Sequence, residues 1–195
     1  MVHIHGVLFF AWTLLFLGQT LLVARGRTVR HRRVGLAGIS LATAMVIFGS
    51  IVSLLANARR VQAGELERAY DLGLGNTVAM VGFGAMVALA IANVRRPDRH
   101  GRWMVFATCM LLNAPVGRLY RPIFAPEAPW PWLVFATVDT ILVACLVHDR
   151  RTLGRPHPVT LVGGAVLLAA QLFRSTIAAT PIWRMTYDTL LRLVG

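Results

Sequence analysis

Four histidines lie at the edges of long apolar segments, where their side chains could serve metal or haem chemistry. His31, His100 and His157 each precede an apolar segment by two or three residues, and His148 directly follows another. Neutral imidazole ligates iron, zinc and copper, and bis-histidine haem ligation needs two histidines at equal depth on facing helices. The four are therefore candidate cofactor-binding residues, with haem b as the expected cofactor and His31 and His100 as the expected axial pair.

His3 and His5 form a second candidate site for a metal ion at the N-terminus. In an extended segment, alternate side chains share one face, so both imidazoles could reach one ion. For all of these histidines the alternative interpretation is that they lie at a membrane interface and bind nothing.

Polar side chains inside the apolar segments form a third candidate site. An ionisable group in hydrocarbon costs about 2.5–3.5 kcal/mol on insertion scales, so such groups often have a function. Asp139 lies nine residues into its segment, and similar depth arguments predict that it pairs with Arg174 or Arg118. Asn113 and Gln171 complete this polar cluster. The alternative is a structural ion pair that fixes the register of the helices.

The elements that must position these residues are apolar segments of bilayer length. The chain has 195 residues, of which 56% are hydrophobic and only 14% are charged. About 20 apolar residues cross a bilayer as a helix, because every backbone group must be paired within lipid. The sequence predicts an all-α membrane helix bundle with six transmembrane helices at residues 7–24, 34–56, 74–94, 103–124, 130–147 and 159–180.

Residues 1–180 are thus expected to form one transmembrane domain, and residues 181–195 a separate amphipathic helix on the outer surface. Two faces can be assigned to this last helix. The apolar face carries Trp183, Tyr187, Leu190, Leu191 and Val194, and the polar face carries Arg184, Asp188 and Arg192.

Arginine supplies all of the basic charge, and its distribution predicts the topology. The net charge is +12, and the 20 basic residues include no lysine, which excludes Schiff-base chemistry. Arginines gather at residues 25–33, 95–102 and 150–155. The positive-inside rule places these loops in the cytoplasm and both termini outside, in a bacterial inner membrane. Because topology explains the charge, nucleic acid is not an expected partner.

One short stretch resembles a motif of small transmembrane b-type cytochromes. In the di-haem ascorbate-dependent cytochromes, a ligand histidine is followed four residues later by Gly and then Leu, and His31, Gly35 and Leu36 match this pattern. The resemblance implies a haem-ligand role for His31 alone. In those cytochromes the ligand histidines lie inside helices, whereas His31 lies at a helix entrance.

The layout of the whole chain resembles uncharacterised six-helix bacterial inner-membrane proteins. This likeness runs from His3 to the Arg-Pro-His-Pro stretch at residues 155–158, and residues 100–104 resemble a His-x-Arg-x-Met stretch of such proteins. It implies a multi-pass membrane protein and no particular activity.

Three functional hypotheses follow from the sequence. The first is a haem b or metal-binding redox protein that transfers electrons. The second is a transporter of a small solute or ion that uses the cluster around Asp139. The third is a non-catalytic subunit that assembles in the bilayer with its own copies or within a larger membrane complex. The chain carries no nucleotide-binding loop and no Ser/His/Asp set. Whether it is an enzyme stays open, because scattered His and Asp residues could still form a site in a membrane hydrolase.

Overall fold

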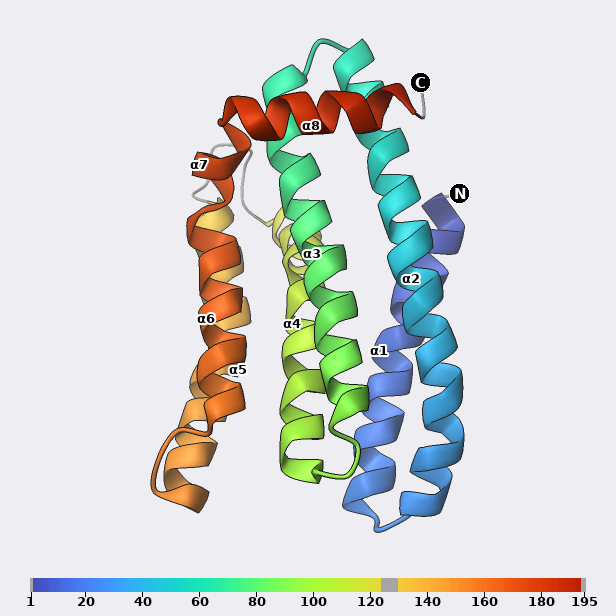
Figure 1. Cartoon of the computed structure of the whole chain (residues 1–195), viewed down its shortest axis with the longest axis vertical. Helices are drawn as coiled ribbons and strands as arrows, with labels where there is room; N and C mark the ends of the chain where they lie inside the picture. Colours follow the sequence, from blue (N-terminus) through green and yellow to red (C-terminus); the bar gives the residue numbers. More distant parts are fainter. Residues whose placement is uncertain (1, 124–129, 194–195) are drawn as a thin grey trace. The chain divides into compact units, whose positions relative to one another are not determined.

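The computed structural model describes residues 2–123 and 130–193, and side chains within residues 4–123 and 132–193. Helices account for all of the regular secondary structure in these ranges (Figure 1), which confirms the all-α class. They are α1 (Val2–Ala24), α2 (Thr28–Gln62), α3 (Leu66–Ala92), α4 (Pro97–Tyr120), α5 (Trp130–Leu153), α6 (Pro158–Leu172), α7 (Arg174–Ala178) and α8 (Pro181–Arg192).

Four helices in the described part of the chain are long and apolar enough to cross a membrane. These are Ile4–Ala24, Thr28–Gln62, Leu66–Ala92 and Trp132–Leu153. They support a membrane protein and correspond to the first, second, third and fifth predicted spans. The predicted spans at residues 103–124 and 159–180 are not among the four.

The sixth predicted span is interrupted. The helix α6 ends at Leu172 after 15 residues, and the short helix α7 begins at Arg174. Phe173 caps α6, and its N–H donates to the Ala169 carbonyl at 3.0 Å. The apolar residues 159–170 and 177–179 led to a prediction of a single run to Thr180, although the polar residues 174–176 directly follow the break.

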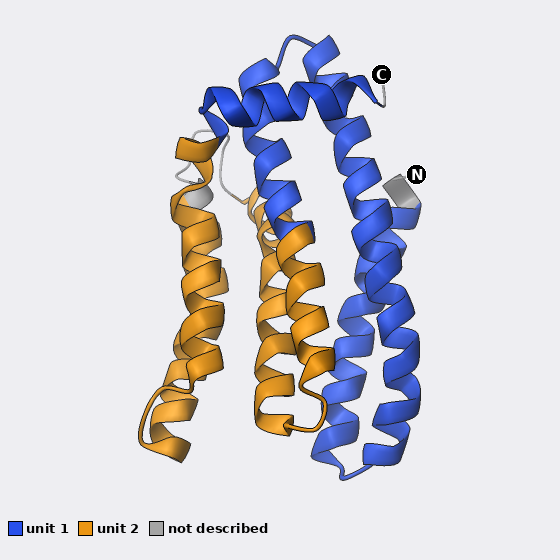
Figure 2. Ribbon diagram, viewed as in Figure 1, with its two compact units in different colours: residues 1–80, 178–195 blue, residues 81–177 orange. Residues whose placement is uncertain are grey.

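The chain divides into two compact units, coloured separately in Figure 2. The first comprises residues 1–80 and 178–195, and the second comprises residues 81–177. The helix α3 contributes its first part to the first unit and its second part to the second unit. This division differs from the expected boundary at residue 180, because α8 belongs with the N-terminal helices.

In the first unit, α1 packs along α2, and α8 lies across the ends of α2 and α3 (Figure 1). Tyr187 of α8 is completely buried, and its hydroxyl accepts a hydrogen bond from Asn57 Nδ2 at 2.7 Å. The Tyr70 hydroxyl donates to Asp188 Oδ1 at 2.9 Å. Gly73 makes room for Tyr187, since a Cβ atom there would lie 2.3 Å from the phenol Cζ. The predicted apolar face of this helix therefore packs on protein through Tyr187 and Leu191.

In the second unit, α4 packs against both α5 and α6. Gly163 of α6 allows a close approach to α4, because a Cβ atom at that position would lie 2.5 Å from the Phe106 ring. Phe106 is completely buried. Small residues bring membrane helices together in this way, and here they bring polar side chains of α4, α5 and α6 within hydrogen-bonding distance.

Candidate functional site

The most extensively bonded group in the second unit is the buried carboxylate of Asp149 on α5. Its Oδ1 accepts a hydrogen bond from Arg102 Nε at 3.1 Å and another from Arg102 Nη2. Its Oδ2 accepts from the Thr160 hydroxyl at 2.6 Å and from the His157 backbone N–H at 3.0 Å. All of these partners are donors, so the ionised carboxylate satisfies them together while it joins α4, α5 and the start of α6.

The start of α6 brings His157 to this network. His157 is the N-cap residue of α6, and Pro158 occupies the first helical turn, where proline lacks only an N–H that the helix does not use. The ring Nδ1 accepts from Val159 N–H at 3.1 Å, and Nε2 lies 3.2 Å from Asp98 Oδ2. Because Nδ1 acts as an acceptor, the proton of a neutral ring resides on Nε2, which then donates to Asp98.

Asp98 lies on the solvent-exposed side of this network, in the first turn of α4. Desolvation by burial disfavours its charge, but the hydrogen bond from His157 and backbone N–H donors outweigh it and lower the pKa of Asp98 below its usual value. A carboxylate in the first turn also interacts favourably with the helix dipole.

Asp139 on α5 has a different partner from the one predicted. Gln171 Nε2 donates to Asp139 Oδ1 at 3.0 Å, and Gln171 is buried. Among the described residues Asp139 forms no ion pair, so the predicted pairing with Arg174 or Arg118 is wrong. The break after Leu172 places Arg174 on α7, and the Arg118 side chain on α4 is exposed.

Two further polar side chains lie on α4, and one of them, Asn113, belongs to the predicted cluster. The Tyr120 hydroxyl lies 2.7 Å from Thr137 Oγ1 of α5. Asn113 Oδ1 is buried without a hydrogen-bond partner in the described part of the chain. Pro115 follows two residues later inside α4 and cannot donate a backbone hydrogen bond to the preceding turn. The polar cluster therefore includes Asp139 and Gln171 in direct contact, with Asn113 on a neighbouring helix.

The histidines of the second unit have separate surroundings. His100 Nδ1 lies 2.9 Å from the Ala90 carbonyl oxygen, which ties the start of α4 to the end of α3. His148 is exposed on α5, and His157 uses both of its ring nitrogens as described above. Within the described residues, no group of three or more His, Cys, Asp or Glu side chains could hold a metal ion.

The remaining candidate histidines belong to the first unit. His31 lies in the first turns of α2, and its backbone oxygen accepts a hydrogen bond from Gln19 Nε2 at 3.2 Å. The centroids of the His5 and Phe9 rings lie 4.2 Å apart. The His3 side chain lies outside the described residues. His31 and His100 belong to different units, and their pairing around haem stays a prediction.

Asp149, Thr160 and Asp98 belong to this network but were not predicted as site residues, and Arg102 was counted only among the arginines that set the topology. Asp149 directly precedes Arg150 and Arg151, so it resembles part of a charged loop. One signal could have indicated it: Asp149 is the single acidic residue within the basic segment 148–155. Thr160 offered no such signal, because a threonine in an apolar helix usually bonds its own backbone.

No family model, curated protein or solved structure matches this chain. The chemistry of the second unit must therefore be argued from its geometry. The Asp149 network is saturated with donors and is suited to holding helices together. The Asp139–Gln171 pair retains capacity to bind a proton or a cation.

Proposed function

We propose that this chain is a multi-pass protein of the bacterial inner membrane that moves protons, alone or with a small solute, through its second unit. The proton-binding group is the Asp139 carboxyl. The observation that carries the proposal is the surroundings of this group: α5 is a candidate membrane span, and Asp139 accepts a single hydrogen bond, from Gln171, among the described residues.

A neutral amide cannot neutralise a carboxylate. Gln171 orients Asp139 but leaves its charge uncompensated, and an isolated charge in an apolar segment is unfavourable. Binding a proton or a cation removes this penalty, and losing it again requires access to water. Carboxyl groups with these properties are used by proton-coupled transporters.

The polar groups of the second unit lie at three levels along α5. Thr137 contacts Tyr120, Asp139 contacts Gln171, and Asp149 contacts Arg102 and Thr160. At 1.5 Å per residue these levels extend over roughly 18 Å. This distribution supports a polar route along α4, α5 and α6 in which Asp139 is the deep binding group.

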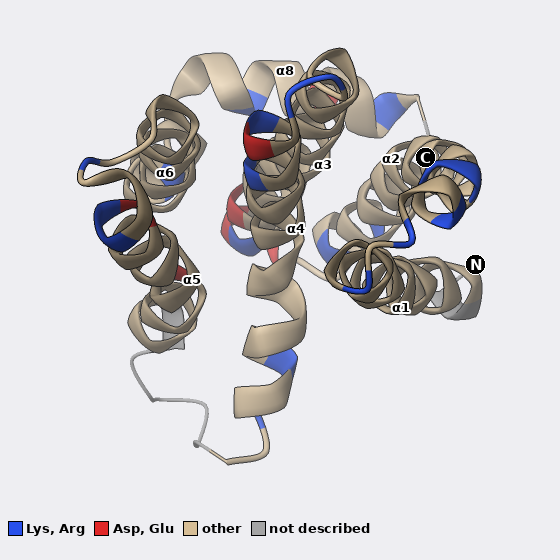
Figure 3. Cartoon of the chain, turned by 90° about the horizontal axis from the view of Figure 1, so that it is seen from below, with Lys and Arg blue, Asp and Glu red and all other residues tan. Residues whose placement is uncertain are grey.

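Arginine distribution supports the proposed orientation. Figure 3 shows basic residues at the turn between α1 and α2, and further arginines occupy the segments at residues 95–102 and 150–155. The positive-inside rule favours cytoplasmic positions for these segments. With this orientation, the N-terminus lies outside.

The haem hypothesis has less support from the geometry. An axial ligand needs a free ring nitrogen, and both nitrogens of His157 are engaged with Asp98 and Val159. A role for His31 and His100 as haem ligands remains testable by the absorption spectrum of the purified protein. Assembly with other membrane subunits remains a further prediction, which co-purification would test.

The proposed function can be tested in proteoliposomes loaded with a pH-sensitive dye. A pH gradient or membrane potential is imposed, and the initial rate of internal pH change is compared with protein-free vesicles. We expect Asp139→Asn to lower the protein-dependent rate at least about tenfold, because an amide cannot exchange a proton in this range. The control is Asp98→Asn, which removes a carboxylate from the exposed edge of the same unit and should keep the rate within about twofold.

Two results would contradict the proposal. One is a wild-type rate equal to that of protein-free vesicles under both driving forces. The other is a normal rate for Asp139→Asn. Elution as a single species and an unchanged unfolding temperature must accompany a slow Asp139→Asn variant, so that loss of folding is excluded.

A further inference from the structure

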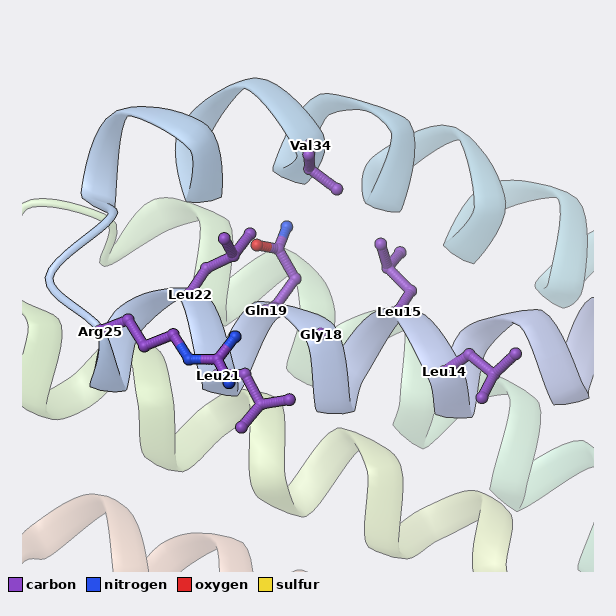
Figure 4. Close-up of a pocket in the computed structure, with 8 residues that line it drawn as sticks. All are labelled: Leu14, Leu15, Gly18, Gln19, Leu21, Leu22, Arg25 and Val34. Carbon is purple, nitrogen blue, oxygen red and sulfur yellow. The ribbon is translucent and has the colours of Figure 1, made fainter.

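A groove on the first unit has features that the proposed proton movement does not use. It runs along α1 beside α2, has a volume of about 320 Å³, and four of its eight lining residues are leucines. Figure 4 shows its lining residues, with Leu14, Gly18, Leu21 and Arg25 along one side of α1. These four are spaced by four, three and four residues, so they share one helix face.

Gly18 forms the floor of this groove between two large side chains. A Cβ atom on Gly18 would meet nothing within 4 Å. Leu14 and Leu21 on either side are 54% and 52% exposed. An elongated apolar ligand could therefore lie against the backbone at Gly18 and contact both leucines.

Arg25 gives the groove a charged end. In Figure 4 its side chain turns back along α1, so that the guanidinium lies beside Leu21. Arg27 and Arg30 follow within the same short turn and the first residues of α2. A ligand that fits this groove thus has an apolar tail and an anionic head, because the guanidinium is suited to phosphate.

The length of the groove matches one leaflet of a bilayer. From Leu14 to Arg25 the helix rises about 16 Å, and half of a 30 Å hydrocarbon core is roughly 15 Å. Arg25 directly follows the candidate span Ile4–Ala24, so it lies at the level of lipid head groups when α1 crosses the membrane. An acyl chain anchored at Arg25 would reach Leu14 near the bilayer centre.

We propose that this groove is a binding site for one anionic glycerophospholipid of the surrounding membrane. The phosphate of the lipid binds Arg25, and one acyl chain occupies the groove over Gly18 between Leu14 and Leu21. Gln19 lines the groove on the α2 side, where its Nε2 donates to the His31 backbone oxygen and joins the two helices.

Native mass spectrometry of the full chain in detergent can test this site. Phosphatidylglycerol and phosphatidylcholine of equal chain length are titrated separately, and the affinity of the first bound lipid is measured. We expect the wild type to bind phosphatidylglycerol about fivefold more tightly than phosphatidylcholine, because one basic residue at the head-group level adds roughly this factor.

Two variants with matched controls separate the head and the tail of the lipid. Arg25→Gln should abolish the preference for phosphatidylglycerol, whereas Arg30→Gln removes the same charge and should keep it. Gly18→Leu should weaken both lipids at least about fivefold, because its side chain fills the space that an acyl chain would use. Gly6→Leu is the control, since Gly6 also has open space around its Cβ position but does not line the groove.

Either of two results would overturn the proposal. The first is unchanged lipid binding by Gly18→Leu, with helix content equal to that of the wild type. The second is an equal loss of preference in Arg25→Gln and Arg30→Gln, which would show a general charge effect. Neither result depends on proton movement, so the lipid site and the proposed function are tested independently.

Discussion

Asp139 and Asp149 lie ten residues apart on α5, but the regions around them differ in how completely they satisfy a negative charge. Around Asp149, Arg102, Thr160 and the His157 backbone donate to both carboxylate oxygens. Around Asp139, Gln171 donates to one oxygen. The first region contains a cation, and the second has a neutral amide.

This difference separates a carboxylate that holds helices together from the carboxylate that we propose as the proton-binding group. A charge that is paired and fully hydrogen-bonded gains little from binding a proton, and removing it leaves its partners uncompensated. A charge with one neutral donor can change its protonation state while the surrounding helices stay in place. We therefore expect aspartate-to-asparagine substitution to lower the free energy of unfolding at position 149. At position 139 the same substitution should leave stability unchanged and lower proton movement.

Asp149→Asn should have the largest effect on stability. Four donors converge on this side chain, and asparagine offers only one acceptor atom while its NH₂ group opposes donors. We expect the free energy of unfolding to fall by about 3–5 kcal/mol, because the partly buried Arg102 would lose its counter-charge and the buried donors would lose their acceptors. Titration with a denaturing detergent, followed by circular dichroism, measures this change.

A double variant sharpens this prediction. Asp149→Leu combined with Arg102→Met removes both charges, so the double variant should lose less stability than the sum of the two single variants, although the Thr160 hydroxyl and the His157 N–H still lose their acceptor. Equal destabilisation by the double variant and by the sum of the single variants would show that the two residues are not coupled.

Thr160→Val should have the second largest effect. Valine keeps the shape of the side chain but removes one of the two donors to Asp149 Oδ2, whose remaining donor is the His157 N–H. The expected loss is about 1.5–3 kcal/mol, the usual range for a hydrogen bond to a charged group. Thr152→Val is the matched control, because Thr152 is exposed and bonds only the His148 carbonyl one turn earlier. If both variants have equal stability, the Thr160 bond contributes nothing.

Asp139→Asn should change stability by less than about 0.5 kcal/mol, because the amide oxygen of asparagine still accepts the hydrogen bond from Gln171. The same detergent titration measures this value. A loss of more than about 2 kcal/mol would instead place Asp139 in the same structural class as Asp149. Retained stability with loss of proton flux is the combination that distinguishes the two regions.

Hydropathy predicted much of the fold, since the helices α1, α2, α3 and α5 cover four of the six expected apolar runs. It failed where tertiary contacts decide the structure. The break at Phe173 is followed by Arg174, Ser175 and Thr176, but these three polar residues were read as part of a continuous span. Residues 181–195 were expected to form a separate helix on the outer surface, but the Tyr187 hydroxyl of α8 accepts a hydrogen bond from Asn57 of α2. Local amphipathicity cannot tell a lipid surface from a protein surface.

The candidate site was predicted in part. Asp139 and Gln171 were recognised as polar groups inside apolar runs, and the structure brings them into contact. The predicted arginine partner was wrong, because depth was counted along an uninterrupted sixth helix. Asp149 was missed because its charge merges with the basic segment that follows it. Counting residues along helices gives depth, but it gives neither the rotation of a helix nor its neighbours.

The Asp98–His157 pair gives the smallest expected effect and tests the exposed edge of the Asp149 network. The hydrogen bond from His157 holds the pKa of Asp98 below its usual 3.8 despite the opposing desolvation. A carboxyl whose pKa is lower in the folded state stabilises that state above its unfolded pKa, and this contribution disappears as the pH falls through the folded pKa.

Asp98→Asn should therefore lower the unfolding temperature by about 1 °C near pH 6. The difference in unfolding temperature between the wild type and the variant should shrink steadily below pH 3.8. Thermal unfolding of both proteins across this range is the measurement. A difference in unfolding temperature that stays constant down to the lowest pH would show that the Asp98 charge does not contribute to stability.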